Sequence, residues 1–313
     1  MSEVRKGSNV MKDFLRNTWK HRAHVVMALP AFLILFFIMY VPMTGIVLAF
    51  KDYKTSLGIF GSDWNGLENF KFLIASKRIF LRMTGNTLMY YAIFTVVGTV
   101  LNVALAIAID QCVFKKATKT MQTIMIIPVF ISYAAVQFIA NAFLHSETGI
   151  INNVFGTSFR FFTEQGVQYW PLILTIVKIW KDTGYGAVLY MSVLAGVDSS
   201  LYEAAEIDGA NKWQKIWHIS LPALIPMITV MLLLSVVSIM KSDTGLFYQV
   251  TRNVGAIHET TQVIDSYVFH AVKTSSNMGF TAATSLFQSV VGLLLMLLAN
   301  GIVRKVHPDN ALF

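Results

Sequence analysis

The sequence predicts an all-α, polytopic membrane protein that crosses the bilayer about six times. Hydrophobic residues make up 55% of the 313 residues and charged residues 13%, whereas soluble proteins carry about 25% charged residues. A soluble domain this apolar would expose large apolar patches, which soluble monomers avoid. The apolar residues also gather in runs of roughly 20 residues, which is long enough to cross a bilayer as a helix.

Six apolar runs are the candidate spans. The first run is longer than the apolar part of a signal peptide, and no small-residue cleavage site follows it, so we expect it to remain in the protein. The fourth run is interrupted by charged residues. The runs extend from Val25 to Phe50, Leu88 to Ile109, Met121 to Phe143, about Trp170 to Val197, about Leu221 to Met240 and about Ala282 to Val303.

The net charge of +8 is interpreted as a topology signal, because the cytoplasmic loops of membrane proteins are enriched in lysine and arginine. We therefore expect contact with membrane lipid and none with nucleic acid. Residues 1–24 form a dense basic tail, and this tail decides the orientation, since the outer loops hold nearly as many basic residues as the inner ones. With the tail inside, both termini are cytoplasmic. The basic residues placed inside are Arg5, Lys6, Lys12, Arg16, Lys20, Arg22, Lys115, Lys116, Lys119, Lys212, Lys215, Arg304 and Lys305.

Two stretches outside the spans repeat apolar residues at helical spacing. Leu67 to Phe80 fits a short helix on the membrane surface, and Val263 to Ala271 fits a helix in the last outer loop. We expect both helices to pack against the rest of the chain rather than to bind a ligand.

A polar stretch separates the fourth and fifth runs. Ser200 with Glu203 has the spacing of a capping box at a helix start. Gly209 can take the left-handed conformation that ends a helix, and Asn211 fits the cap of a second short helix, from Lys212 to Ile219. Pro222 and Pro226 stand at the base of the fifth run, where a first helical turn needs no N–H donor. These devices predict a rigid helical hairpin on the cytoplasmic face.

The complete string goes beyond a well-capped hairpin. Glu203-Ala204-Ala205 is followed by Asp208-Gly209-Ala210, then by Ile219 and Leu221-Pro222. This order and spacing resemble the EAA signature in the membrane (permease) subunits of binding-protein-dependent ABC importers. Weaker likenesses extend over most of the chain: Asn86-Thr87-Leu88, Trp180 with Thr183-Gly184, and two regions, 41–53 and 263–292, that resemble carbohydrate-type members importing complex oligosaccharides.

The resemblance implies a type I ABC importer permease fold in a bacterial plasma membrane. Residues 25–85 would hold the first helix and an outer loop, residues 86–313 the permease core, and residues 198–221 the coupling loop. The implied partners are a cytoplasmic ABC ATPase dimer, a second homologous permease that forms a heterodimer with this chain, and an extracellular or periplasmic solute-binding protein. The implied ATPase contacts are Glu203, Ala204, Ala205, Asp208 and Gly209.

Other chemistry is missing from the sequence. No G-x-x-x-x-G-K-[ST] phosphate loop occurs, and neither the scattered histidines nor the single cysteine, Cys112, has metal-ligand spacing. We therefore expect no cofactor and no enzymatic activity in this chain, with ATP hydrolysis by a separate chain.

Charged residues in the fourth run are candidates for a translocation pathway. A charge at mid-bilayer costs roughly 2.5–3.5 kcal/mol on insertion scales, so such residues face a cavity or pair with one another. Lys178 is three and four positions from Lys181 and Asp182, which suggests a shared helix face. The alternative is a helix that begins later and leaves Lys178 at the outer interface, where lysine reaches toward water. Weaker pathway candidates are Gln137, Asn141, Tyr185 and Tyr190.

A second function stays open from the sequence: a stand-alone secondary transporter or channel for a small polar solute. Inverted repeats or paired broken helices would favour it, and the sequence shows neither. Lys241 and Asp243, at the end of the fifth run, are expected at the membrane interface.

Overall fold

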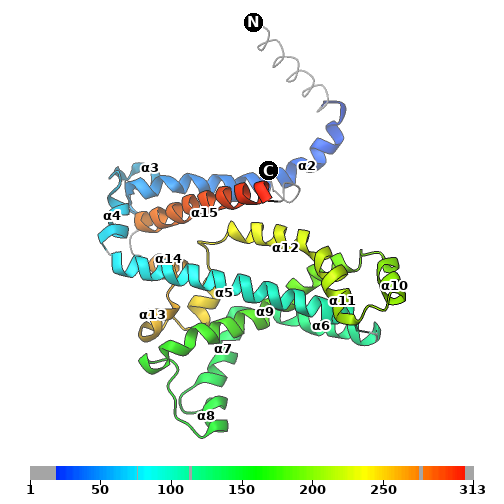
Figure 1. Cartoon of the computed structure of the whole chain (residues 1–313). Helices are drawn as coiled ribbons and strands as arrows, with labels where there is room; N and C mark the ends of the chain where they lie inside the picture. The colour runs from blue at the N-terminus through cyan, green and yellow to red at the C-terminus, as the bar shows by residue number, and fades with distance from the viewer. Residues whose placement is uncertain (1–18, 76, 113–114, 275–277, 307–313) are drawn as a thin grey trace.

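The computed structural model describes residues 19–75, 77–112, 115–274 and 278–306. These residues are almost wholly helical (Figure 1), which confirms the all-α class. The described part holds one pair of two-residue strands, Lys51–Asp52 (β1) and Asp63–Trp64 (β2), which pair antiparallel. The basic residues Arg5, Lys6, Lys12 and Arg16 lie outside the described residues.

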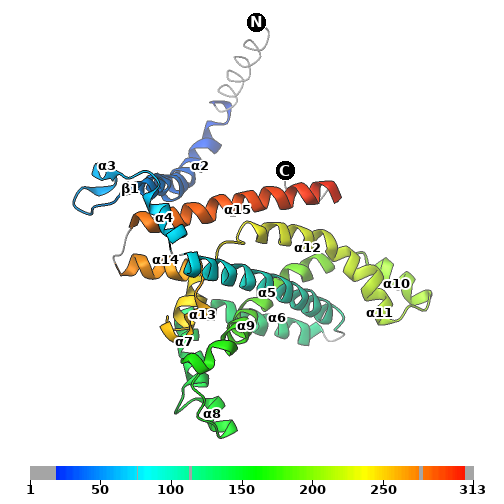
Figure 2. The ribbon, with the colours of Figure 1, turned by 60° about the vertical axis from the view of Figure 1, so that its left-hand side comes forward.

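The first predicted span is a helical rod of 29 residues, Arg22–Phe50. It comprises Arg22–Leu35 (α2), a π-helical turn Phe36–Tyr40 (η1) and a 3-10 stretch Val41–Phe50 (η2). None of its most apolar window is buried inside the chain, so lipid or another subunit must cover it. The η2 end packs along the last helix, Met278–Val306 (α15), and the two lie side by side in Figures 1 and 2.

A small outer unit follows the rod. It holds Gly58–Gly61 (α3), the strand pair, and Glu68–Ala75 (α4). The helix expected between Leu67 and Phe80 thus ends earlier, at Ala75, and Phe80 belongs to the next helix, Lys77–Asp110. Asn69 is buried and fastens this unit, because its amide Nδ2 donates to the carbonyl oxygens of Ala49 at 3.1 Å and Lys51 at 2.9 Å.

The bundle is built on two long helices, Lys77–Asp110 (α5) and Trp170–Leu194 (α9), which pack along each other. Leu221–Val236 (α12) and α15 complete it. Gly184 of α9 permits a close approach to Lys115–Phe130 (α6), since a Cβ there would lie 1.7 Å from the carbonyl oxygen of Met125. Small residues serve this purpose where membrane helices meet.

The third predicted span, Met121 to Phe143, is broken into two helices. The chain forms α6 and then Tyr133–Leu144 (α7), which are bent by 97° relative to each other. Pro128 lies in the last turn of α6, and Ser132 caps the start of α7 by accepting a hydrogen bond from the Ala135 N–H. A proline removes a backbone donor and so weakens the continuation of a helix.

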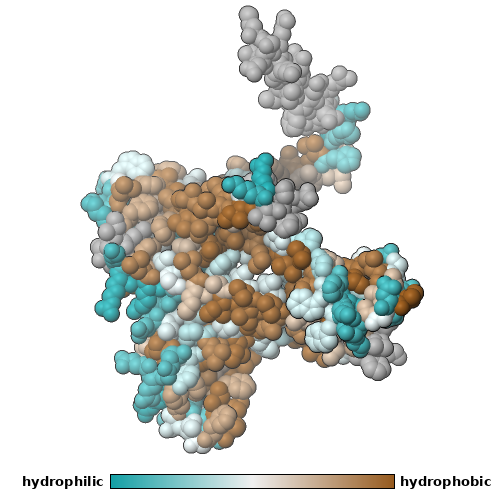
Figure 3. Space-filling view, viewed as in Figure 1, coloured by the Kyte–Doolittle hydropathy of each residue, from teal (hydrophilic) through white to brown (hydrophobic). Residues whose placement is uncertain are grey.

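Four of the described helices are long and apolar enough to cross a membrane, and the bent pair counts as a fifth candidate. The remaining predicted span is α9, which is 25 residues long but carries Lys178, Lys181 and Asp182. The structure therefore supports a polytopic membrane protein. Apolar side chains cover the middle of the bundle, and hydrophilic ones gather at its ends (Figure 3).

Short elements connect the longer helices: Ile150–Phe155 (α8), Glu164–Tyr169 (η3), Gly245–Val250 (η5), Gly255–Ile257 (η6), His258–Thr261 (α13) and Ile264–Lys273 (α14). The helix α14 confirms the prediction for the last outer loop. This region is tied to α5, because Asn86 Nδ2 donates to the Gln262 carbonyl at 2.9 Å and the Tyr90 hydroxyl donates to the Thr260 carbonyl at 2.8 Å. The helix α5 begins at Lys77, before the predicted start of the second span at Leu88, so Asn86-Thr87-Leu88 lies inside this helix.

Candidate functional site: a projecting loop and a polar groove

The polar stretch after α9 begins with a helix, Ser199–Ile207 (α10), which projects from the bundle beside α11 (Figures 1 and 2). Its cap is Asp198, whose carboxylate accepts a hydrogen bond from the Ser200 N–H at 2.9 Å. The predicted Ser200–Glu203 capping box is therefore wrong, since Ser200 already lies inside the helix. The same hydrogen bond lowers the pKa of the Asp198 carboxyl, because it stabilises the charged form.

The end of α10 explains the sequence Asp208-Gly209-Ala210. Gly209 has φ +78°, which confirms the predicted left-handed bend. The Gly209 N–H donates to the Glu206 carbonyl at 3.0 Å, and the Ala210 N–H donates to the Ala205 carbonyl at 2.8 Å. These two bonds are the pair that defines a Schellman motif, which satisfies helix-end carbonyls. The turn after α10 is consequently ordered by its own backbone.

The chain then re-enters a helix, Lys212–Lys215 (α11), and Asn211 is its predicted cap. A reciprocal pair of bonds forms, with Asn211 Oδ1 accepting from the Gln214 N–H at 3.0 Å and Gln214 Oε1 accepting from the Asn211 N–H at 2.7 Å. This helix does not end at Ile219 as expected. A π-helical turn, Ile216–Ser220 (η4), joins it to α12, so Lys212–Val236 is one helical segment of 25 residues.

The outward surface of α10 mixes small, acidic and apolar side chains. Glu203, Ala204, Asp208 and Gly209 are exposed and Ala205 is half-buried. Ile207 is 87% exposed at the tip of the helix.

Two side-chain contacts join α10 to the segment that follows, and the sequence reasoning missed both. The Glu206 carboxylate pairs with the Lys215 ammonium, which lowers the pKa of Glu206. The Tyr202 and Ser220 hydroxyls lie 2.9 Å apart. No periodic pattern reports such pairs, because the partners belong to different helices.

A polar groove runs between α5, α9, α12 and the chain that follows α12. It consists of two adjoining hollows of about 240 and 300 Å³, which share Phe94, Thr95, Lys178 and Ser235. Tyr91 and Ser235 bridge α5 and α12 with their hydroxyl oxygens 2.9 Å apart. The other polar side chains along the groove are Thr99, Asn102, Asp182, Thr183, Ser238, Lys241, Ser242 and Asp243.

Three charged groups meet in this groove. The Lys178 ammonium lies 2.7 Å from Asp182 Oδ2 and 3.6 Å from Asp243 Oδ2. Asp243 Oδ1 also accepts from the Gly245 N–H at 3.0 Å, at the start of η5. Asp243, expected at the membrane interface, thus also lines the groove. The alternative of a late helix start at Lys178 is wrong, because α9 begins at Trp170.

Lys181 has a different environment from Lys178, although the spacing suggested a shared face. It is buried, and its ammonium donates to the carbonyl oxygens of Pro128 at 3.2 Å, Val129 at 2.7 Å and Ile131 at 2.6 Å. These carbonyls belong to the end of α6 and the break after it, where helical hydrogen bonding stops. All three ammonium donors are engaged by the protein itself, so Lys181 is placed to hold the break and not to meet a solute.

The weaker pathway candidates are scattered. Tyr190 lines the groove, but it is buried in a core cluster with Val103 and Leu224. Tyr185 is 56% exposed and is not among the groove-lining residues. Gln137 and Asn141 lie on α7, and Asn141 Oδ1 accepts from Arg252 at 3.2 Å.

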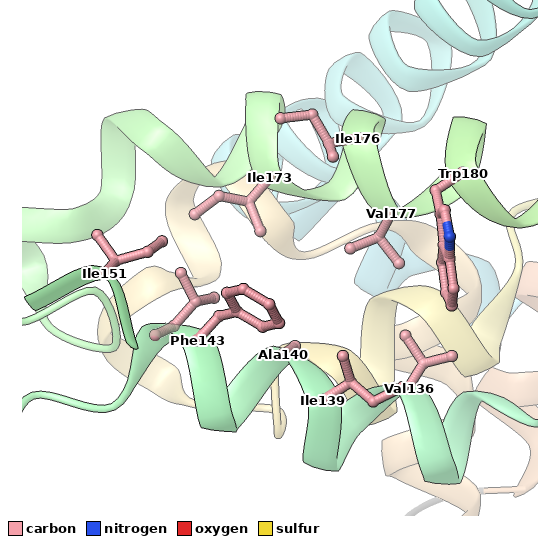
Figure 4. Close-up of a pocket in the computed structure, with 10 residues that line it drawn as sticks. Val136, Ile139, Ala140, Phe143, Ile151, Ile173, Ile176, Val177 and Trp180 are labelled. Atoms are coloured by element: carbon pink, nitrogen blue, oxygen red, sulfur yellow. The ribbon is translucent and has the colours of Figure 1, made fainter. Parts of the chain in front are cut away.

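A separate hollow, of about 490 Å³, lies between α7, α8 and α9 and has an almost entirely apolar lining (Figure 4). The side chains of Phe143, Ile173 and Trp180 are among those around it. A hydroxyl-rich solute would lose its hydrogen bonds to water there without replacement. Of the two places, the groove is the one suited to a polar solute. Within the described residues, no group of three or more His, Cys, Asp and Glu side chains could hold a metal ion.

Comparison with known proteins assigns the family. Residues 113–308 match the family described as binding-protein-dependent transport system inner membrane component. Protein LplB of Bacillus subtilis (strain 168) is 30% identical, over 97% of this chain and 94% of that protein. The polygalacturonan/rhamnogalacturonan transport system permease protein YteP of the same organism is 32% identical, over 91% of this chain and 88% of that protein.

Solved structures share this fold over more than nine-tenths of the chain. A bacterial ABC transporter involved in the import of the acidic polysaccharide alginate contains a chain that matches with a TM-score of 0.84 and 27% identity, over 94% of this chain and 99% of that one. The alginate transporter in complex with an alginate pentasaccharide-bound periplasmic protein matches with a TM-score of 0.82 and 28% identity, over 93% of this chain and 97% of that one. The fold is that of an ABC importer permease, a transport subunit whose ATPase is a separate chain. The chain thus belongs to the family of inner membrane components of binding-protein-dependent transport systems.

Proposed function

We propose that this chain forms one wall of the translocation pathway for an oligosaccharide, and that a separate ATPase drives it through residues 198–221. The observation that carries the proposal is the helix α10, which presents Glu203-Ala204-Ala205 outside the bundle and ends in an ordered Schellman turn. A stiff element that projects from membrane helices can transmit force from a soluble partner, whereas a flexible loop would absorb it.

The polar groove supports the choice of solute. Hydroxyl and amide side chains line it together with the aromatic Phe94 and Tyr90, and sugars offer hydroxyl groups for hydrogen bonds and apolar ring faces for packing against aromatic rings. The relatives named for polygalacturonan, rhamnogalacturonan and alginate transport agree with a carbohydrate substrate. The groove residues of this proposal are Lys178, Asp182, Asp243, Asn102 and Ser235.

The partners follow from the same proposal. Glu203, Ala204, Ala205, Asp208 and Gly209 contact one subunit of a cytoplasmic ATPase dimer. A second, different permease completes the pathway and covers the first span, which this chain leaves unburied. A solute-binding protein delivers the oligosaccharide at the outer end. Both termini lie in the cytoplasm of a bacterial cell.

A cross-linking experiment tests the proposed ATPase contact. The single cysteine is first removed by Cys112→Ser, and Ala204→Cys then places a thiol on the exposed face of α10. With a cysteine scan across the ATPase surface, we expect a disulfide at one patch in membranes that contain the assembled complex. Glu147→Cys, an exposed residue before α8, is the matched control and should form none. Cross-links from Glu147→Cys but not from Ala204→Cys would contradict the proposal.

A further inference from the structure

Helix α10 has backbone connections to two membrane helices, and these connections differ. Toward α9, the chain passes through the turn Ala195–Val197 to the cap Asp198, which bonds within α10 itself. Toward α12, two side chains of α10 reach across to α11 and η4. The side-chain contacts described for α10 thus join it to the segment that leads into α12.

The first contact is the ion pair of Glu206 with Lys215. Lys215 is buried, with 11% of its side chain exposed, whereas 70% of the Glu206 side chain is exposed. The stem of Lys215 is therefore covered by the chain, and its ammonium is held against the Glu206 carboxylate. Removing Glu206 leaves Lys215 with its charge and without this partner.

The Tyr202–Ser220 contact lies on the same side of α10 as the Glu206–Lys215 pair. Tyr202 and Glu206 are four residues apart on α10 and share one face of that helix. Lys215 and Ser220 are five residues apart, a spacing that an ordinary α-helix would turn away from one face. The π-helical turn Ile216–Ser220 has i→i+5 hydrogen bonding and so brings Ser220, which is fully buried, into line with Lys215. The π turn lets one face of the α11–η4 segment meet one face of α10 twice.

We propose that Glu206 and Lys215, together with Tyr202 and Ser220, are positioning residues that fasten α10 to the base of α12. When α10 moves, α12, which is the fifth span, moves with it. This motion reaches the groove, because Met231, Leu232 and Ser235 of α12 form part of the groove lining. The turn toward α9 acts as the hinge. This inference rests on the proposed function, because it describes how force from the ATPase reaches the groove.

The test separates coupling from assembly. The complex of this chain with its ATPase, partner permease and binding protein is reconstituted in proteoliposomes, and the ATP hydrolysed per oligosaccharide imported is measured. We expect Glu206→Gln and Lys215→Met to keep the ATPase bound and hydrolysing while uptake falls about tenfold, which lies within the usual range of coupling between sites. The exchanged pair, Glu206→Lys with Lys215→Glu, should recover most of the uptake, since it rebuilds the contact with reversed charges.

Two further variants separate a loss of coupling from other effects of mutation. Lys54→Met removes an ion pair with Asp63 in the outer loop and should leave the ratio of ATP to oligosaccharide unchanged. Tyr202→Phe deletes one hydroxyl and keeps the ring, so it still tests the fastening of α10 to α12 if a charge variant fails to assemble. We expect Tyr202→Phe to raise the ratio of ATP to oligosaccharide less than Glu206→Gln does. A ratio equal to wild type in both Tyr202→Phe and Glu206→Gln would overturn the proposal.

Two further outcomes also decide it. Loss of ATPase binding in Glu206→Gln that the exchanged pair does not restore would mean that Glu206 contacts the ATPase directly, and the fastening role would be wrong. Failure of the proposed function would be recognised earlier and separately, because the wild-type complex itself would then show no ATP-dependent oligosaccharide uptake.

Discussion

The Lys181 ammonium lies 2.6 Å from the carbonyl oxygen of Ile131, at the point where the third membrane segment breaks. The cation faces the negative end of α6, which is the arrangement that the helix dipole favours. It also lies 5.1 Å from the centre of the Tyr133 ring, the first residue of α7. One buried lysine of α9 thus connects both halves of the broken span.

Replacing this lysine should destabilise the protein. Lys181→Met keeps the apolar stem and removes the ammonium from the carbonyls of Val129 and Ile131, whereas the Pro128 carbonyl still accepts from the Ile131 N–H at 3.2 Å. Each buried group left unsatisfied costs about 1–3 kcal/mol. We expect a marked fall in the thermal unfolding temperature of the purified complex. Lys178→Met is the matched control, because Lys178 lies on the same helix in the open groove and contacts no backbone carbonyl of the break in the described structure. Equal unfolding temperatures for the two variants would contradict this role for Lys181.

The groove charges should affect transport more than stability. Asp182→Asn and Asp243→Asn each remove one partner of Lys178 and leave the shape of the groove unchanged. We expect both to alter oligosaccharide-stimulated ATP hydrolysis, because groove contacts differ between the access states of a transporter. Combination with Lys178→Met should be non-additive by about 0.5–3 kcal/mol, as for residues in one charge network. Additive effects on the stimulated rate would argue that the three groups act separately.

Gly209 offers a test of the turn after α10. A side chain at its φ of +78° is strained by about 1–2 kcal/mol, although a Cβ there would meet nothing within 4 Å. Gly209→Ala should therefore weaken uptake, and Gly209→Pro, which fixes φ near −65°, should abolish it while the protein still reaches the membrane. Gly255→Ala is the control, since Gly255 has equally open space and an ordinary φ. Wild-type uptake by Gly209→Pro would rule out the turn as a needed element.

Topology can be tested by labelling. In the Cys112→Ser background, Ala117→Cys should react with a membrane-impermeant maleimide only after the cells are opened, because the charge distribution places the turn Lys115–Lys119 inside. Glu147→Cys should react in intact cells. Reversal of this pattern would invert the orientation and move α10 out of reach of a cytoplasmic ATPase.

Features encoded by neighbouring residues were predictable from the sequence. The bend at Gly209 and the cap at Asn211 depend on local composition, and the structure has both. Four of the six apolar runs are helices long and apolar enough to span a membrane in the described structure. Where two local signals competed, the prediction failed: Asp198 and Ser200 are both good caps, and the chain uses the earlier one.

Features that depend on distant residues were not predictable. The break after Phe130 has local signals in Pro128 and the cap Ser132, which the sequence analysis did not use. The group that stabilises the break, Lys181, belongs to another segment and could not be predicted. Asp243 joins the groove for the same kind of reason, since its partner Lys178 lies on α9. The EAA string predicted the class of protein, while the side chains that fasten α10 to α12 emerged from the fold.

The break also constrains the order in which the chain can mature during synthesis. The segment α6–α7 leaves the ribosome before α9, so its carbonyl groups enter the insertion machinery without Lys181. Unsatisfied backbone groups cost several kcal/mol each in hydrocarbon, and release of this segment into lipid alone would expose them. The third segment is therefore costly to release into lipid until α9 has been made and Lys181 can donate to the break.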